Sequence, residues 1–243
     1  MNFAIIAAGE GSRLAQEGVM LPKPLVDIDG HPMIGRLLDI FARCGADRIV
    51  VCVNEFMTEV RDFLENYTFT SVKSSDIPEL ILKVKTTPSS MHTMAEIADS
   101  MQGHGRWIAT TVDTIFHEED FIRYVRAWEK APAVTDVMMA VTDFVDDEKP
   151  LWVITDPDDM RIEGFVDERP ENARYISGGI YGLSDSAIGV LRRCMQEGVS
   201  RMRNYQRRLV SGGLDVRAFP MGKIIDVDHA ADIAVANRFL REK

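Results

Sequence analysis

The chain has 243 residues, of which 46% are hydrophobic and 27% charged, a composition typical of a folded globular protein with one large domain or two small ones. Its net charge of −10 argues against a nonspecific nucleic-acid binder, because such a protein needs a positive field to displace the counterions of the phosphate backbone. The three cysteines fit neither a zinc pattern nor a disulfide framework. No stretch approaches the roughly 20 apolar residues of a membrane span, and no basic segment precedes the first apolar run. We therefore expect a soluble cytoplasmic protein with neither nucleic acid nor a membrane among its partners.

The first 130 residues alternate short apolar runs with amphipathic stretches. An unbroken apolar run indicates a strand that is buried on both faces, whereas apolar residues at helical spacing indicate a helix that packs on a sheet. These patterns predict strands over residues 3–8, 48–53, 80–84 and 107–112, and helices over residues 33–41, 57–64, 90–98 and 118–128. Ser90 is predicted to cap the helix that it begins. Strands that alternate with helices indicate right-handed crossovers and a mostly parallel sheet.

The rhythm changes after residue 130, where predicted strands follow one another with little helix between them. The strands predicted there cover residues 137–141, 151–154 and 175–176, and helices return at residues 186–197 and 229–241. We therefore predict a single domain with an α/β, Rossmann-like fold, in which helices flank a mostly parallel, mixed sheet and a β-rich insertion lies beside the active face. Ligands of such sheets bind where loops leave the carboxyl ends of strands, so the chemistry is expected just after Ala8 and just after Val112.

Two glycines, Gly9 and Gly11, follow the first strand. Glycine permits positive φ and lets backbone N–H groups approach a phosphate without interference from a Cβ atom. A dinucleotide-binding fingerprint is excluded because Leu14 stands where glycine or alanine is needed, and a Walker-type Gly-Lys-Ser/Thr sequence is absent. A short Gly-x-Gly could equally be an ordinary tight turn. The presence of Arg13 and Lys23 in the same glycine- and proline-rich loop favours a phosphate site, because these side chains neutralise phosphate oxygens.

A longer pattern contains this glycine loop. It consists of Ala7-Ala8-Gly9-Glu10-Gly11-Ser12-Arg13, then Pro22-Lys23-Pro24, then Pro32-Met33-Ile34. The pattern resembles the signature of the sugar-phosphate nucleotidyltransferases, also called nucleotide-sugar pyrophosphorylases. The resemblance implies a nucleotide-diphospho-sugar transferase-like fold in which residues 1–130 bind the nucleotide, residues 131–222 form the acceptor side, and residues 223–243 form a terminal strand and helix. It also implies that Arg13 holds the leaving pyrophosphate and that Lys23 contacts the reacting phosphates. The residues implied to wrap the nucleotide are Ala7, Ala8, Gly9, Glu10, Gly11 and Ser12.

Two acidic residues near predicted strands are candidates for a metal site. Asp113 comes directly after the strand at 107–112, where an aspartate can also be an ordinary turn former. The segment Thr110-Thr111-Val112-Asp113-Thr114 resembles the strand end at which the family's aspartate binds a metal. The resemblance therefore implies a Mg²⁺ cofactor held by Asp113. Late in the chain, residues 223–232 resemble the family's terminal strand, in which an aspartate before the last helix binds the metal. With Asp232 as the reference position, the resemblance implies Asp226 as the second ligand, as in relatives that act on hexose phosphates. Other relatives place this ligand two residues later, at Asp228, but we expect Asp228 to cap the final helix.

Further residues resemble the substrate-contacting parts of the family. Ser89 and Ser90 occupy the position of a Gly-Thr-Ala-like turn that faces the nucleobase, although one serine is also needed as a helix cap. Glu168 and Arg169 resemble a Glu-Lys-Pro segment that serves the acceptor's hydroxyl and phosphate groups, with arginine in place of lysine. Gly179 resembles a glycine in the strand beside the sugar ring, although such a glycine can equally mark a β-bulge or close packing.

The resemblance implies an enzyme, a nucleotidyltransferase that joins an NTP to a sugar 1-phosphate or another small phosphorylated acceptor and releases pyrophosphate. The acceptor phosphate would attack the α-phosphorus in line, and positioning and charge stabilisation would supply most of the catalysis. One alternative is a cytidylyltransferase that acts on a phosphorylated alcohol such as phosphocholine. Another is a catalytically silent homologue that senses nucleotide sugars, although such a homologue would be expected to have lost Arg13, Lys23 or Asp113. The sequence decides neither the nucleobase nor whether the chain forms a homo-oligomer.

Overall fold

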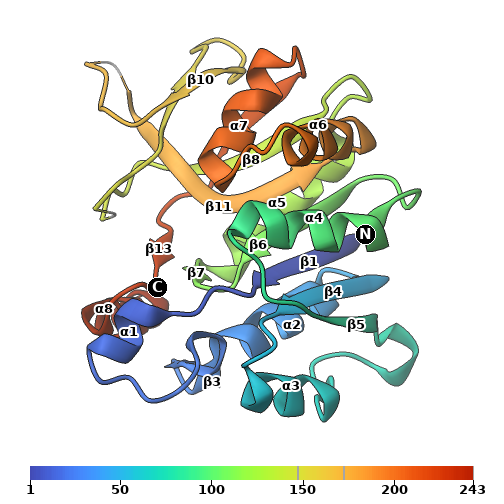
Figure 1. The fold of residues 1–243 in the computed structure, drawn as a ribbon, viewed down its shortest axis with the longest axis vertical. Coiled ribbons are helices and arrows are strands. Elements are labelled where there is room, and N and C mark those ends of the chain that lie inside the picture. The colour runs from blue at the N-terminus through green and yellow to red at the C-terminus, as the bar shows by residue number, and fades with distance from the viewer. Residues whose placement is uncertain (147, 172, 243) are drawn as a thin grey trace.

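The computed structural model describes residues 1–146, 148–171 and 173–242. Within these residues, nine strands form a mixed sheet at the centre of the molecule (Figure 1). The main path of the sheet is β10-β9-β11-β6-β1-β4-β5, and β8 pairs with β11 and β12. The strands of this sheet are β1 (Asn2–Ala7), β4 (Arg48–Val53), β5 (Glu79–Val84), β6 (Trp107–Thr111), β8 (Val137–Thr142), β9 (Trp152–Thr155), β10 (Ile162–Val166), β11 (Tyr175–Leu183) and β12 (Val216–Pro220).

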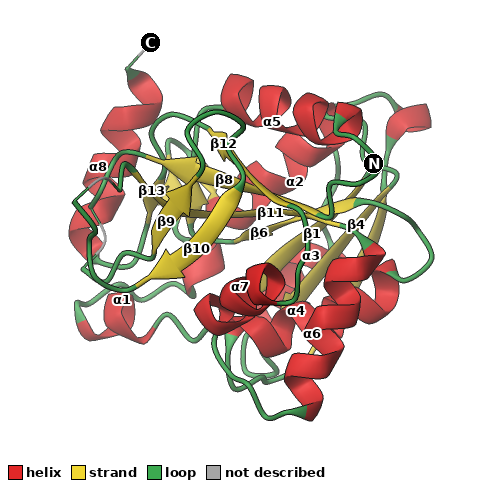
Figure 2. Ribbon diagram, turned by 90° about the horizontal axis from the view of Figure 1, so that it is seen from above, coloured by secondary structure: helices red, strands yellow, loops and turns green. Residues whose placement is uncertain are grey.

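Helices cover both faces of the sheet (Figure 2). The helices are α1 (Ser12–Gln16), α2 (Met33–Arg43), α3 (Thr58–Glu65), α4 (Ser90–Met101), α5 (Glu118–Lys130), α6 (Asp185–Gln196), α7 (Met202–Ser211) and α8 (Ala230–Arg241). One face of the sheet packs against α4, α6 and α7, and the other packs against α2, α3 and α5. β1 shows why both faces are covered, since Ala4 and Ile6 are buried on the first face and Phe3 and Ile5 on the second. None of the described helices is both long and apolar enough to span a bilayer.

The predicted parallel core is confirmed. β1 lies between β4 and β6 and runs parallel to both, with Ile6 paired to Cys52 on one side and to Thr111 on the other. The carboxyl ends of β1 and β6 therefore lie next to each other, and the Val112 N–H donates to the Ile6 carbonyl at 3.1 Å. The loops that follow Ala8 and Val112 consequently leave the same edge of the sheet, which is where the sequence places the chemistry.

β11 joins the two halves of the chain in one sheet. Its last residues run antiparallel to β6, with Ile180 opposite Thr110, and its first residues pair with β9. The strand bends in between, where its register against β8 shifts and Gly179 adopts a φ of +73°. A Cβ atom on Gly179 would lie 2.6 Å from the Thr114 hydroxyl oxygen. This glycine therefore serves both a β-bulge and close packing.

The second half of the chain contains more regular structure than the sequence predicts. The apolar pattern does not reveal β10, β12 or α7, and it predicts only the first two residues of the nine-residue β11. Glycines dilute the apolar run of β11, and α7 carries three arginines among few apolar residues. The prediction that Ser90 caps α4 is also wrong. Ser89 is the N-cap residue, because its backbone is extended whereas Ser90 is already helical.

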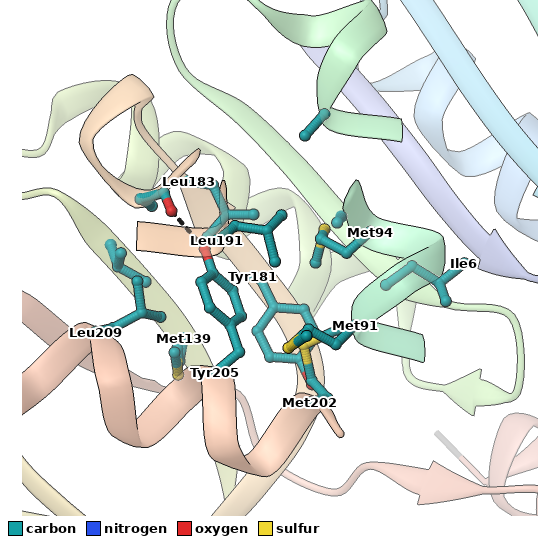
Figure 3. Close-up of a cluster of buried hydrophobic side chains, with 14 of the residues drawn as sticks. Ile6, Met91, Met94, Met139, Tyr181, Leu183, Leu191, Met202, Tyr205 and Leu209 are labelled. Atoms are coloured by element: carbon teal, nitrogen blue, oxygen red, sulfur yellow. Dashed lines mark hydrogen bonds between the residues drawn. The ribbon is translucent and has the colours of Figure 1, made fainter. Parts of the chain in front are cut away.

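A cluster of large apolar side chains lies between the sheet and the helices of its first face (Figure 3). Tyr181 of β11 and Tyr205 of α7 lie in this cluster with Met91 of α4 and Leu191 of α6, and each is at most 5% exposed. The Tyr205 hydroxyl donates to the Ala187 carbonyl at 3.0 Å, which satisfies its polar atom inside the core. The cluster therefore fixes α6 and α7 against α4, the helix that borders the site.

The C-terminal segment returns to the N-terminal loops. In this segment, β13 (Ile225–Asp226) pairs with β7 (Thr114–Ile115). The short elements of the N-terminal loops are the 3-10 helix η1 (Lys23–Leu25) and the paired strands β2 (Asp27–Ile28) and β3 (His31–Pro32). A further 3-10 helix, η2, covers Ser74–Asp76. Phe239 of α8 shares a buried cluster with Leu14, which follows the glycine loop. The segment between β13 and α8 is thereby held beside that loop.

Candidate active site

A cleft of about 580 Å³ opens at the carboxyl ends of β1 and β6. Its walls are the glycine loop, the start of α4, and the residues that follow β4 and β6. The residues that line it are Ile6, Ala8, Gly9, Glu10, Gly11, Ser12, Arg13, Lys23, Asn54, Thr87, Pro88, Ser89, Ser90, Thr93, Thr111, Val112, Asp113 and Asp228. Of the residues predicted to wrap the nucleotide, Ala7 is buried in the core on the other face of the sheet, and the rest line this cleft.

The glycine loop approaches Lys23 closely. Gly11 has a φ of +62°, and a Cβ atom on it would lie 2.7 Å from Lys23 Cβ. A larger residue is therefore disfavoured at position 11 both by the backbone conformation and by the packing. A Cβ atom on Gly9 would have no atom within 4 Å, so this part of the loop borders open space.

Lys23 lies between two carboxylates. Its Nζ is 2.5 Å from Asp113 Oδ2 and 2.6 Å from Asp228 Oδ1, and only 9% of its side chain is exposed. Burial alone would lower the pKa of Lys23, but Asp113 and Asp228 outweigh this effect and raise it. Burial would likewise raise the pKa of Asp228, yet Lys23 and Arg13 hold it below its ordinary value. Arg13 Nη1 completes the network at 2.8 Å from Asp228 Oδ2, so one carboxylate binds two cations.

Asp228 lines the cleft, and Asp226 is not among the described residues that line it. Asp226 lies in β13, where it accepts a hydrogen bond of 3.3 Å from Thr114 Oγ1 and borders a small neighbouring cavity. The prediction that Asp228 caps the last helix is wrong. The N-cap residue is His229, and Asp232 Oδ2 accepts the N–H groups of Asp228 and His229 at 2.9 Å and 2.7 Å. The Asp228 carboxylate instead pairs with Lys23 and Arg13 in the cleft.

Glu17 provides a second contact between the glycine loop and the start of α8. Its Oε2 accepts the Ala230 N–H at 2.6 Å, and its Oε1 lies 2.6 Å from His229 Nδ1. The hydrogen bond to His229 lowers the pKa of Glu17 and raises that of His229. Arg13 and Glu17, at the two ends of α1, therefore both hold the segment that carries Asp228. No spacing in the sequence indicates this contact, because its partners lie more than 200 residues apart.

We expect Glu17→Gln to lower the thermal unfolding temperature by at most about 4 °C, with the largest effect in a defined pH window. The folded-state pKa of Glu17 is lowered, so its contribution is present above its unfolded pKa of about 4.3 and is lost as the pH falls. The folded-state pKa of His229 is raised, so its contribution is present below about pH 6.5 and is lost as the pH rises through the folded pKa. Unfolding temperatures of wild type and variant should thus differ most between about pH 4.3 and 6.5. Glu65→Gln removes the same charge from an exposed position of α3 and is the control. An equal loss for Glu17→Gln at every pH would contradict the prediction.

Asn54 lines the cleft but is not identified by the sequence reasoning above. Its side chain is 3% exposed, Nδ2 donates to the Ala8 carbonyl at 3.4 Å, and Oδ1 accepts from Thr86 Oγ1 at 3.1 Å. The sequence does contain a signal for Asn54, which is its position at the carboxyl end of a predicted strand. Asn54 directly follows the buried parallel strand β4, and Asp113 likewise comes soon after β6. Asn54 thus anchors the backbone at the point where β1 leads into the glycine loop.

Hydroxyl groups gather in the cleft at the start of α4. Ser89 and Ser90 line it together with Thr87 and Thr93, whose Oγ1 atoms lie 2.7 Å apart. Ser89 Oγ is 2.8 Å from His92 Nδ1, so His92 orients that serine. The result is a small surface that can both donate and accept hydrogen bonds, as the resemblance implies for a nucleobase site.

The three predicted acceptor residues do not meet in this cleft. Glu168 and Arg169 lie in the exposed segment after β10, where the Arg169 guanidinium is 4.8 Å from the centre of the Trp152 ring. Gly179 lies at the bend of β11 next to Thr111, which does line the cleft. A role of these residues in acceptor binding stays a prediction.

A family model described as the MobA-like NTP transferase domain matches residues 3–159, which is more than half of the chain. The chain belongs to the MobA-like NTP transferase family. The matched region contains the glycine loop, Lys23 and Asp113, whereas Asp228 lies beyond it. The structure therefore shows that Asp228 lines the cleft, whereas the family match does not extend to this residue.

Curated relatives of this MobA-like protein match it over part of their length. The glucose-1-phosphate cytidylyltransferase of Salmonella typhimurium is 28% identical over 67 residues, which is 28% of this chain and 26% of the relative. The 2-aminoethylphosphonate cytidylyltransferase of Lancefieldella rimae is 38% identical over 64 residues, or 26% of each chain. The aligned segments thus span about a quarter of the length of these relatives. Among solved structures, a candidate glucose-1-phosphate thymidylyltransferase of Bacillus anthracis has a TM-score of 0.81 at 19% identity, with 100% of this chain and 96% of that chain covered. This likeness shows a common fold.

Proposed function

We propose that this MobA-like protein transfers a nucleotidyl group from an NTP to a sugar 1-phosphate and releases pyrophosphate. The observation that carries the proposal is the convergence of the glycine loop, Arg13, Lys23, Asp113 and Asp228 on one cleft. Backbone N–H groups and two cations can bind a triphosphate, and two carboxylates can bind the divalent ion that accompanies it. The partial match to enzymes named as cytidylyltransferases supports the same reaction class.

The two carboxylates fit a magnesium ion. A cation already lies between them in the structure, since Lys23 Nζ contacts both Asp113 and Asp228. Within residues 1–146, 148–171 and 173–242, no group of three or more acidic, histidine or cysteine side chains could hold a metal. Two carboxylates suffice for Mg²⁺, which commonly takes its remaining ligands from water and substrate phosphates. Asp113 and Asp228 would hold the ion, which would supply charge neutralisation at the phosphates when bound.

The residues of the chain would act by holding charge in place. An oxygen of the acceptor phosphate forms a bond to the α-phosphorus, the bond from that phosphorus to the oxygen bridging to the β-phosphate breaks, and pyrophosphate leaves with this oxygen. Because a phosphate monoester is already an anion at neutral pH, the chain needs no strong general base. The amides of the glycine loop and Arg13 would hold the leaving group, and Lys23 would neutralise the α-phosphate. Most of the catalytic effect then comes from positioning.

A second candidate is cytidylyl transfer to a phosphorylated alcohol such as phosphocholine. The position of Asp228 favours it, because Asp228 contacts Lys23 and lines the cleft. A ligand at Asp226 is the register of the hexose-phosphate enzymes that the sequence resembles, and a ligand at Asp228 is the register of other relatives. The reaction at the α-phosphorus is the same for both candidates, and they differ in the base and the acceptor.

A screen of pyrophosphate release tests both candidates. Purified protein is incubated with Mg²⁺, with ATP, CTP, GTP or UTP, and with either a panel of hexose 1-phosphates or a panel of alcohol phosphates that includes phosphocholine. Release that needs a hexose 1-phosphate and stops on addition of EDTA supports the proposed function. Release only with CTP and an alcohol phosphate supports the second candidate. Nucleotide binding without pyrophosphate release in any combination would contradict both and favour a catalytically silent sensor.

A further inference from the structure

Lys23 occupies the space that the proposed function assigns to the metal. Its Nζ lies 2.5 Å from Asp113 Oδ2 and 2.6 Å from Asp228 Oδ1. A magnesium ion bound to the same two oxygens would lie about 2.1 Å from each. An ammonium group and a divalent ion cannot share this space, because their positive charges would repel at very short range. The two cations therefore compete for one pair of carboxylates.

The stem of Lys23 is held in place by its surroundings. The side chain is 9% exposed, and its Cβ packs against Gly11 so closely that a Cβ atom there would lie 2.7 Å away. Lys23 also begins the 3-10 helix η1 and stands between Pro22 and Pro24, which fix φ on both sides of it. Release of the carboxylates therefore requires the outer part of the lysine side chain to turn away while the backbone stays where it is.

A buried ammonium group that loses both carboxylates needs another anionic partner, because an unpaired buried charge is strongly unfavourable. The glycine loop and Arg13 border the same cleft, so a bound triphosphate would bring phosphate oxygens close to Lys23. Those oxygens offer the lysine a new partner and offer the metal additional ligands. Without the triphosphate, neither gain is present.

We infer that Lys23 is a placeholder cation, which fills the metal site of the free protein and gives it up to a divalent ion when a nucleoside triphosphate binds. This inference rests on the proposed function, since it takes Asp113 and Asp228 as the metal ligands. It goes further in that metal and nucleotide must bind with positive coupling, and the free protein must bind divalent ions weakly. By reciprocity, the metal raises the affinity for the nucleotide by the same factor.

Binding of Mn²⁺ to the nucleotide-free protein tests the placeholder role. Free Mn²⁺ is measured by electron paramagnetic resonance during titration of wild type, Lys23→Met and Lys23→Arg. Lys23→Met removes the competing charge and should bind Mn²⁺ on the order of 10- to 100-fold more tightly than wild type. Lys23→Arg keeps a cation and should bind as weakly as wild type. Equal or weaker binding by Lys23→Met would overturn the inference.

Lys85→Met is a matched control, because Lys85 Nζ is also paired with a carboxylate, at 2.6 Å from Glu96 Oε1, but it does not line the cleft. This variant should bind Mn²⁺ as wild type does. Tighter binding by Lys85→Met would mean that any lost positive charge raises the metal affinity, which would also overturn the inference.

Thermal unfolding covers the case in which Lys23→Met is unstable. Removal of the lysine leaves Asp113 and Asp228 facing each other, so the variant should unfold at a lower temperature than wild type without metal. Addition of Mn²⁺ should restore most of the loss, or refold a variant that is unfolded, while wild type gains little. A variant that Mn²⁺ neither stabilises nor refolds would contradict the placeholder role. These measurements need no turnover, so they stand even if the pyrophosphate screen finds no activity, and activity with unchanged Mn²⁺ binding would refute only the placeholder role.

Discussion

Lys23→Ala is expected to reduce pyrophosphate release about 100- to 1000-fold, because removal of one preorganised contact to a developing charge typically costs that much in rate. The variant should still fold. Asp113 and Asp228 are 22% and 36% exposed, and Arg13 continues to neutralise Asp228 after the lysine is lost. Rates are measured at saturating Mg²⁺ with the substrate pair that the screen identifies, and circular dichroism checks the fold.

Lys85→Ala is the control for this experiment. It removes a lysine from an exposed ion pair outside the cleft, and exposed pairs contribute little to stability or to a distant site. Its turnover should match that of wild type. Turnover close to wild type in folded Lys23→Ala protein would show that Lys23 does not contact the reacting phosphates.

Asp228→Asn and Asp226→Asn should differ strongly in turnover, because Asp228 lines the cleft and contacts Lys23 and Arg13 there, whereas Asp226 borders the small neighbouring cavity. We expect Asp228→Asn to lose on the order of 100-fold or more, since asparagine keeps the shape of the side chain but removes the charge that a divalent ion requires. Asp226→Asn should lose less than about tenfold. Apparent Mg²⁺ requirements, measured as activity against metal concentration, should rise for Asp228→Asn and stay near wild type for Asp226→Asn.

The two substitutions are isosteric and remove one charge each, so each serves as the control for the other. The opposite order of effects would make Asp226 the second ligand. It would also restore the register of the hexose-phosphate enzymes and remove the structural support for a phosphorylated alcohol as acceptor.

The parallel core and its first loop could be predicted from the sequence because their signals are local. β4 has the predicted bounds of 48–53, since an unbroken apolar run and a following polar residue define a buried strand and its end. Arg13 and Lys23 are indicated by their place in the loop rich in glycine and proline, and Asp113 is indicated by its place after a strand together with the resemblance. The cleft confirms that these three residues lie together.

The second carboxylate could not be decided from the sequence. Asp226 and Asp228 are two residues apart, and side chains at i and i+2 of an extended segment point to the same side, so alternation alone does not separate them. β13 is only two residues long and carries no periodic pattern of its own. Its position depends on the ladder with β7 and on the packing of α8 against Leu14, both of which join segments that are distant in the chain. Glu17 was missed for the same reason.

The return of the C-terminal segment to the glycine loop also sets the time at which the site can form during synthesis. Asp228 follows Asp113 by 115 residues, the difference of their two positions. At about 5–20 residues per second, a ribosome needs on the order of ten seconds to cover that distance. The nascent chain can therefore assemble β1, β4, β5 and β6 while Lys23 still lacks one of its two partners. A newly made molecule would pass through a stage in which these four strands are paired but its cleft carries an uncompensated positive charge.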